Sequence, residues 1–214
     1  MSGTLPNFSN TQILVIGDIM LDRYWAGNAS RISPEAPVPV VDIKDVDNRL
    51  GGAANVALNL ATLGCKVTLT GFVGNDSPGK IVGKLIEEKG ISNEIVTSSE
   101  AQTITKLRVL SSHQQLIRLD FEEETTHQDA DLLSTRVEHI IDNMDAVIIS
   151  DYAKGAVSQP ENVIKLCNER DIDVYVDPKG TDFSRYKRAK VITPNRGELE
   201  AVIGKHKSIE TTLD

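Results

Sequence analysis

Two adjacent glycines, Gly51 and Gly52, stand just before an apolar run with helical spacing, and this stretch most constrains the fold. The run covers residues 56–63 and ends at Gly64, a natural C-terminal stop for a helix. Glycines at this place allow a tight turn and a close approach of a ligand to the backbone. Since the first N–H groups of a helix lack partners, an oxygen-rich ligand can bind there beside the Asn55 amide. A glycine N-cap that serves only close helix packing is the alternative.

Apolar runs of strand length alternate with helical patterns along the rest of the chain. Strands are predicted at residues 12–17, 66–73, 93–97, 145–150, 173–177 and 190–193, and helices at 79–90, 130–144 and 160–170. This alternation predicts an α/β protein with a mostly parallel sheet. In such sheets ligands bind at the carboxyl ends of the strands.

Composition excludes several function classes for these 214 residues. The net charge of −8 argues against nucleic acid or an anionic membrane as the main partner. The N-terminal ten residues have no signal-peptide pattern, and no apolar run reaches membrane-spanning length. Cys65 and Cys167 lie outside any metal or redox motif and are interpreted as reduced packing residues. We therefore expect a cytoplasmic protein with one domain.

Acidic side chains follow two of the predicted strands. Asp18 and Asp22 come after the first strand, and Asp151 comes after the strand at 145–150. At strand ends these carboxylates are candidates to accept hydrogen bonds from sugar hydroxyls, and Lys154 is a candidate to bind a phosphate. A helix N-cap or solvated turn is the alternative for Asp18 and Asp22, and a salt bridge is the alternative for Asp151 with Lys154.

Two alternating segments, 103–110 and 114–120, predict a β-hairpin. The alternation places Lys106 and Arg108 on one face, where Arg118 of the partner strand can join them. Three cations close together in an acidic chain indicate capture of a phosphate that the substrate already carries. A solvated strand face is the alternative.

Three further polar residues follow the last two predicted strands. Lys179 can reach nucleotide phosphates as a mobile point charge. Asn195 and Glu198 stand three residues apart at a helix start, where both can face one site and where Glu198 can order Mg²⁺ through water. The same pair also fits a capping box, and both roles can hold together.

The arrangement from Gly51-Gly52 through Asn55 and Ala57 to Gly64 and Gly74 resembles the first signature of the ribokinase-like (PfkB) carbohydrate kinases. The resemblance implies a three-layer α/β/α sandwich with a mostly parallel sheet and a small β lid. It implies a core at about 11–22, 51–98 and 123–214 and a lid at about 23–50 and 100–121. The proline-rich residues 31–41 fit an edge strand or a loop leading into one. Family members often dimerise through the lid, so a homodimer is expected to bury Val38, Val40 and Ile117.

The wording of residues 22–25 and 31–40 is similar to a narrower group, the heptose-phosphate kinases of lipopolysaccharide precursor synthesis. That resemblance implies ATP-dependent phosphorylation of the anomeric O1 of D-glycero-β-D-manno-heptose 7-phosphate to the 1,7-bisphosphate, within ADP-heptose synthesis. Another sugar kinase of the same family and a non-catalytic sugar-phosphate-binding module are the alternatives.

The family's roles extend to the residues that match its motifs. Asp22, Gly51, Gly52, Asn55 and Asp151 would bind the sugar. Residues Lys106, Arg108 and Arg118 would hold its phosphate, and Lys179, Asn195 and Glu198 would serve Mg²⁺ and ATP. The family's later Gly-Ala-Gly-Asp motif, which carries the catalytic base, does not follow Glu198. We therefore expect a truncated kinase domain that is inactive alone, with its base beyond Asp214.

Overall fold

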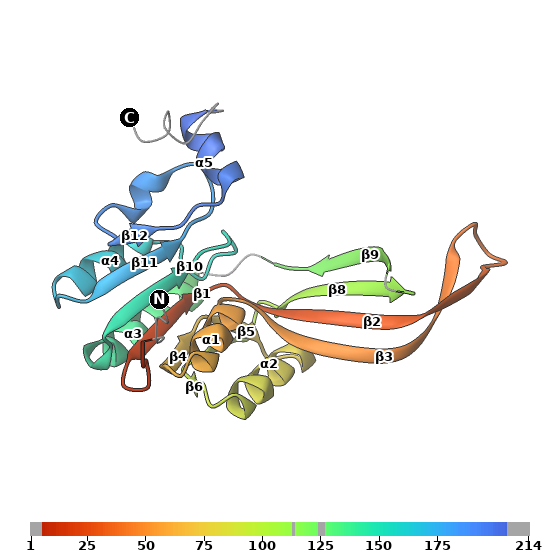
Figure 1. Cartoon of the computed structure of the whole chain (residues 1–214), viewed down its shortest axis with the longest axis horizontal. Helices are drawn as coiled ribbons and strands as arrows, with labels where there is room; N and C mark the ends of the chain where they lie inside the picture. Colours follow the sequence, from red (N-terminus) through yellow and green to blue (C-terminus); the bar gives the residue numbers. More distant parts are fainter. Residues whose placement is uncertain (1–5, 113, 124–126, 205–214) are drawn as a thin grey trace, which may run out of the picture.

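The centre of the fold is a six-stranded parallel sheet (Figure 1). The computed structural model describes residues 6–112, 114–123 and 127–204. The strand order is β12-β11-β10-β1-β4-β6. The strands are β1 (Gln12–Gly17), β4 (Lys66–Thr70), β6 (Ser92–Asn93), β10 (Ala146–Ser150), β11 (Asp173–Asp177) and β12 (Val191–Ile192). The central strands are apolar because both of their faces are covered.

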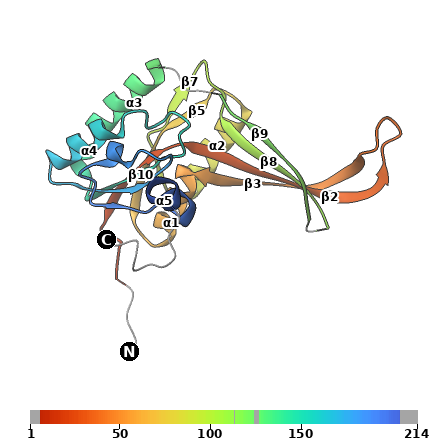
Figure 2. The ribbon, with the colours of Figure 1, turned by 90° about the horizontal axis from the view of Figure 1, so that it is seen from above.

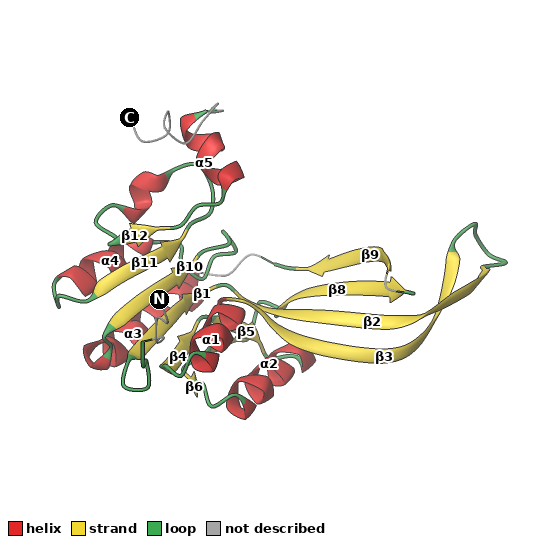
Figure 3. Cartoon of the chain, viewed as in Figure 1, coloured by secondary structure: helices red, strands yellow, loops and turns green. Residues whose placement is uncertain are grey.

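Helices cover the two faces of this sheet, so the predicted three-layer sandwich is confirmed (Figure 3). Helices α3 (His127–Ile140) and α4 (Pro160–Asn168) pack on the face that carries Leu14 and Ile16. Helices α1 (Ala53–Thr62) and α2 (Ser77–Glu88) pack on the face that carries Ile13 and Val15. Successive residues of β1 point to opposite faces, which is why one strand contributes to both cores. Each large aliphatic side chain buried in this way stabilises the fold by about 1.5–3 kcal/mol.

A second sheet of four strands extends from one side of this body (Figures 1 and 2). Its order is β3-β2-β8-β9, and it is called the lid sheet below. The strands are β2 (Ile19–Ile32), β3 (Pro39–Gly52), β8 (Ile104–Ser111) and β9 (Gln114–Phe121). Strands β8 and β9 form the predicted hairpin, and β3 is the edge strand expected after the proline-rich segment. Residue 113 of the predicted hairpin link lies outside the described residues.

The segment 66–73, predicted as one strand, forms two. Strand β4 ends at Thr70, and β5 (Phe72–Gly74) pairs with β7 (Val96–Ser98) in a separate sheet. The break falls at Gly71, where a Cβ atom would lie 2.3 Å from the carbonyl oxygen of Gly17. The close approach of two backbones at this glycine ends the central strand, and the prediction of a single strand was therefore wrong.

The glycine turn before α1 has the geometry that the sequence indicates. Gly52 has φ +55° and ψ −134°, and a Cβ atom there would lie 2.2 Å from the carbonyl oxygen of Asp18. That carbonyl accepts the N–H of Ala53 at 2.9 Å, the first residue of α1. Gly64, with φ +97°, follows the C-terminal end of the helix. The turn thus ties the end of the lid sheet to the start of α1.

The remaining helices are short, and one carries the expected cap. Helix α5 (Arg196–Ile203) begins after Asn195, whose side chain accepts the N–H of Glu198 in a complete capping box. The described part of the chain also contains the 3₁₀ turns η1 (Ile141–Asn143) and η2 (Phe183–Tyr186). Among the described residues, no helix has the length and apolar character needed to cross a membrane.

Candidate functional site

Four strands of the parallel sheet end at one edge and bring the predicted site segments together. Strands β1, β10, β11 and β12 are parallel neighbours, so their carboxyl ends lie side by side. The residues that follow them are 18–22, 151–155, 178–182 and 193–198. The lid sheet begins at the same edge, because β2 starts two residues after β1 ends. The candidate site is therefore the corner between the sheet edge and the lid sheet.

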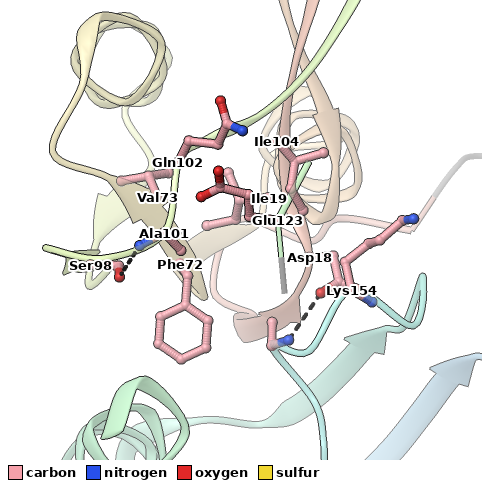
Figure 4. Close-up of a pocket in the computed structure, with 11 residues that line it drawn as sticks. Asp18, Ile19, Phe72, Val73, Ser98, Ala101, Gln102, Ile104, Glu123 and Lys154 are labelled. Carbon is pink, nitrogen blue, oxygen red and sulfur yellow. Dashed lines mark hydrogen bonds between the residues drawn. The ribbon is translucent and has the colours of Figure 1, made fainter. Parts of the chain in front are cut away.

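Asp18 organises the neighbouring loop. Its carboxylate is 2% exposed and accepts N–H groups of Tyr152 at 2.7 Å, Lys154 at 3.1 Å and Ala156 at 3.0 Å. Burial raises the pKa of the Asp18 carboxyl, and these three donors oppose the shift. Asp18 and Lys154 line a narrow hollow of about 10 Å³ at the base of the lid sheet (Figure 4). Backbone donors reach both oxygens of this buried carboxylate, which holds the loop in place, and a contact of Asp18 with sugar hydroxyls stays a prediction.

Asp151 is also buried, 3% exposed, and its nearest cation is Arg185, whose Nη1 atom lies 3.9 Å from Asp151 Oδ2. Its carboxylate accepts the Tyr186 hydroxyl at 2.7 Å and the Ala153 N–H at 2.7 Å. Burial and this hydrogen bond raise the pKa of Tyr186 to about 12. Lys154 instead pairs with Glu122 at 2.7 Å, so the alternative of a salt bridge between Lys154 and Asp151 was wrong. A hydroxyl contact of Asp151 stays a prediction.

Asp22 lies in the lid sheet and forms an ion pair that the sequence did not indicate. The Arg108 Nη1 atom donates to Asp22 Oδ1 at 2.6 Å, and the two side chains are 19% and 22% exposed. Gly51 makes this position of Asp22 possible, because a Cβ atom at Gly51 would lie 2.5 Å from Asp22 Oδ2. Parallel pairing of β2 with β8 brings the two residues together across 86 positions of sequence. A residue predicted to bind the sugar and a residue predicted to bind its phosphate are therefore in direct contact.

The three predicted phosphate-binding cations share one face of the lid sheet. In the strand register, Lys106 lies opposite Asp22 of β2 and opposite Asp120 of β9. Arg108 lies opposite Arg118 of β9. Lys106 Nζ lies 3.6 Å from Asp120, and Arg118 Nε lies 3.0 Å from Asp120. The predicted common face is confirmed. Carboxylates hold the cations there.

The start of α1 adds an amide next to Asp22. Asn55 is exposed and lines a hollow of about 510 Å³ that also contains Asp22 and Tyr24. Gly51 and Gly52 form the end of β3 directly before this helix. The start of α1 thus places an amide beside a carboxylate, and the two together can bind several hydroxyls of one sugar.

The predicted nucleotide-side residues form a second cluster at the sheet edge. Lys179 Nζ donates to Glu198 Oε1 at 2.9 Å, and the Asn195 N–H donates to Glu198 Oε2 at 2.9 Å. Burial opposes ionisation of Glu198, but these donors outweigh it and lower its pKa. Burial, together with Glu198, raises the pKa of the nearby Asp177 carboxyl. Glu198 is therefore a carboxylate shared between a lysine and a helix start.

Tyr152 directly follows Asp151 at the same sheet edge, and the sequence analysis gave it no role. Burial raises the pKa of its phenol, and the charges of Asp177, Asp22 and Glu198 add to that shift. The side chain is 37% exposed, while its backbone N–H is held by Asp18. An aromatic residue that directly follows Asp151 at a strand end was the available signal. Tyr152 thus lies within electrostatic reach of both the sugar side and the nucleotide side.

The carboxylates at this edge suit Mg²⁺ held through water. Within residues 6–112, 114–123 and 127–204, no three His, Cys, Asp or Glu side chains group as a direct metal site. Mg²⁺ keeps several waters and takes one or two carboxylates together with substrate phosphates. Glu198 and Asp177, with the Asn195 amide, are a donor set of that kind.

Fold and site together define the class of protein. The chain belongs to the pfkB family of carbohydrate kinases, whose pattern matches residues 10–214. Solved structures agree on the fold. The tetrameric inhibited form of Escherichia coli phosphofructokinase-2 matches with a TM-score of 0.73 at 18% identity, over 95% of this chain and 67% of that one. The Arabidopsis thaliana ribokinase complexed with ribose and ATP matches with a TM-score of 0.68 at 17% identity, over 95% and 66%.

Among curated proteins the similarity is much higher. The chain is 52% identical over 204 residues to the bifunctional protein HldE of Shewanella sp. strain ANA-3. The bifunctional protein HldE of Shewanella baltica strain OS155 matches at the same identity. In both cases the match covers 95% of this chain and 43% of the relative, so the chain spans less than half the length of these proteins.

Proposed function

We propose that the chain is part of an ATP-dependent kinase that phosphorylates the anomeric O1 of D-glycero-β-D-manno-heptose 7-phosphate. The product is the 1,7-bisphosphate, an intermediate of ADP-heptose synthesis for the lipopolysaccharide core. The observation that carries the proposal is the contact between Asp22 and Arg108 beside the Gly51-Gly52 turn. The contact places a carboxylate that can accept hydrogen bonds from hydroxyls beside a guanidinium that can donate hydrogen bonds to a phosphate. A sugar that is already phosphorylated requires both groups in one site.

The sugar ring would lie between the lid sheet and the start of α1. Asp22 would accept hydroxyls of the ring, and the backbone at Gly51 and Gly52 with the Asn55 amide would bind its other oxygens. Asp151 would contribute a further acceptor if the Tyr186 hydroxyl shares its carboxylate. These groups would orient the anomeric hydroxyl toward the nucleotide, and orientation supplies much of the catalysis in phosphoryl transfer.

The 7-phosphate would bind the polar face of the lid sheet. Lys106, Arg108 and Arg118 are present there, and guanidinium groups suit phosphate because they donate two parallel hydrogen bonds. A phosphate dianion would compete with Asp22 for Arg108. The carboxylate released in this way is then free to accept a sugar hydroxyl, which links recognition of the phosphate to recognition of the ring.

ATP and Mg²⁺ would bind at the other cluster. Lys179 would neutralise nucleotide phosphates, and Glu198 would hold Mg²⁺ through water while Asn195 keeps the carboxylate in place. When bound, the metal neutralises charge on the transferred phosphoryl group. An ATP-dependent step of precursor synthesis would operate in the cytoplasm.

We further propose a homodimer through the lid. The face of the lid sheet opposite to Asp22 exposes apolar side chains, including Val46 and Ile117 at 50% each and Phe121 at 44%. Val38, in the loop between β2 and β3, is also 50% exposed, and Val40 is half-buried. A second copy of the chain that covers this face would remove these side chains from water.

A substrate panel tests the kinase proposal. Phosphoryl transfer from ATP would be measured with heptose 7-phosphate, unphosphorylated heptose and other sugar phosphates, on this chain and on a protein as long as its relatives. We expect heptose 7-phosphate to be preferred, and Asp22→Ala to weaken its binding more than tenfold. Asp42→Ala on the exposed part of β3 is the matched control and should change nothing. Preference for an unphosphorylated sugar would refute the assignment.

A further inference from the structure

The ring of Tyr24 is flanked by two guanidinium groups that come from the neighbouring strands of the lid sheet. Arg49 Cζ of β3 lies 4.5 Å from the ring centroid, and Arg108 Cζ of β8 lies 5.1 Å from it. Tyr24 belongs to β2, the strand between them. A cation over an aromatic face is stabilised and held in a defined orientation. Tyr24 therefore fixes the position of both guanidinium groups relative to Asp22.

Arg49 lines the same hollow as the residues that are predicted to bind the sugar. The hollow of about 510 Å³ is lined by Asp22, Tyr24, Arg49 and Asn55, and by Lys89 at the end of α2. Asp22 and Arg49 are direct neighbours in the register of β2 and β3, so both side chains point to the same face. A sugar bound by Asp22 and Asn55 would thus have the Arg49 guanidinium within the same hollow.

The ion pair of Arg49 is more exposed than the ion pairs of Lys106 and Arg108. Arg49 Nε donates to Asp47 at 2.7 Å, but the two side chains are 62% and 43% exposed. Exposed ion pairs of this kind contribute little to stability because water and salt screen them. Lys106 and Arg108, by contrast, are about four-fifths buried with their carboxylates. A ligand phosphate can therefore engage Arg49 at less cost than Lys106 or Arg108.

We propose that Arg49 is a specificity residue that binds the phosphate carried by the sugar substrate, and that Tyr24 is the residue that positions it. The inference rests on the proposed function and adds a phosphate-binding residue that the motifs did not indicate. Arg49 donates up to two hydrogen bonds to phosphate oxygens, and its ion pair with Asp47 breaks when it does so. Arg49 and Arg108 then bind the phosphate from the two sides of the Tyr24 ring.

The test is calorimetric binding of heptose 7-phosphate and of unphosphorylated heptose to this chain and to variants. Arg49→Ala is expected to weaken binding of heptose 7-phosphate by about 10- to 100-fold, the loss of one or two charge-assisted hydrogen bonds. Binding of unphosphorylated heptose should not change. Arg49→Lys should recover only part of the affinity, because an ammonium cannot form the bidentate contact. Tyr24→Leu should lower affinity for the phosphorylated sugar by about three- to tenfold through loss of the stack.

Lys44→Ala is the matched control, since Lys44 is a similarly exposed cation of β3 that does not line the hollow. Its affinity for both sugars should equal that of the unmodified chain, and urea midpoints of all variants would verify folding. Equal binding of heptose 7-phosphate by Arg49→Ala and the unmodified chain would overturn the role of Arg49 and leave the proposed function standing. Loss of both sugars to the same extent would also overturn it. Failure of the unmodified chain to bind either sugar would refute the proposed function and this inference together.

Discussion

The substitution Gly52→Ala should destabilise the fold strongly, because Gly52 joins the lid sheet to α1. Its φ of +55° with ψ of −134° is a backbone conformation that only glycine adopts readily. The added Cβ would lie 2.2 Å from the Asp18 carbonyl oxygen and 3.1 Å from Met20 Cγ. The carbonyl oxygen belongs to the backbone and cannot rotate away.

The magnitude follows from three costs. Backbone strain of this type costs about 1–3 kcal/mol. Moving the Asp18 carbonyl breaks its hydrogen bond with the Ala53 N–H, now 2.9 Å long, which costs about 1 kcal/mol or more. Repacking of Met20 adds to both. A loss of at least about 2 kcal/mol is a large part of the 5–15 kcal/mol that stabilises a typical domain.

Urea unfolding followed by circular dichroism would measure the effect, with Gly51→Ala as the matched control. At Gly51 the added Cβ meets the Asp22 carboxylate, 2.5 Å away, which is the end of a side chain and can turn aside. Gly51→Ala should therefore cost much less stability but should displace Asp22 from Arg108 and weaken sugar-phosphate binding. A free energy of unfolding for Gly52→Ala within 1 kcal/mol of the unmodified chain, roughly the value of one hydrogen bond, would refute the reasoning.

Three shorter predictions follow from other contacts. Asp18→Ala removes the acceptor of one buried and two part-buried N–H donors and should lower the free energy of unfolding by about 3 kcal/mol, measured in urea. Burial opposes ionisation of Asp76, but hydrogen bonds led by those from Thr103 lower its pKa in the folded state. The ionised carboxylate therefore stabilises the fold above the usual pKa of about 3.9. This stabilisation is lost as the pH falls through the lower pKa of the folded state. Asp76→Asn should flatten that acid-side loss in urea titrations stepped through this range; an unchanged slope would contradict it. Lys179→Met should weaken Mg-ATP binding in calorimetry and raise the pKa of Glu198 toward its ordinary value, and unchanged affinity would exclude Lys179 from the nucleotide site.

Local patterns predicted the parts of the fold that depend on neighbours in sequence. The spacing in residues 103–120 predicted the hairpin and the shared face of its cations, because side chains alternate in any strand. The glycine turn and the capping box at Asn195 were predicted for the same reason. The break at Gly71 was missed, since it depends on the approach of Gly17 from a distant strand.

Contacts between distant segments could not be predicted from such patterns. The pair of Asp22 and Arg108 depends on β2 lying parallel to β8, and the sequence gives no register for strands so far apart. The same holds for the Asp18 carboxylate, whose three donors lie more than 130 residues away. Residues with the right chemistry at a strand end were found, but which of them faces a ligand depends on the tertiary structure.

The most direct test of the central claim is a calorimetric titration of this chain with heptose 7-phosphate beside unphosphorylated heptose. The claim is that the lid face and the start of α1 form one site for a phosphorylated sugar. The account predicts saturable binding of heptose 7-phosphate at least about tenfold tighter than binding of unphosphorylated heptose, the value of one charge-assisted hydrogen bond. Equal affinity for the two sugars, or binding of neither, would contradict it.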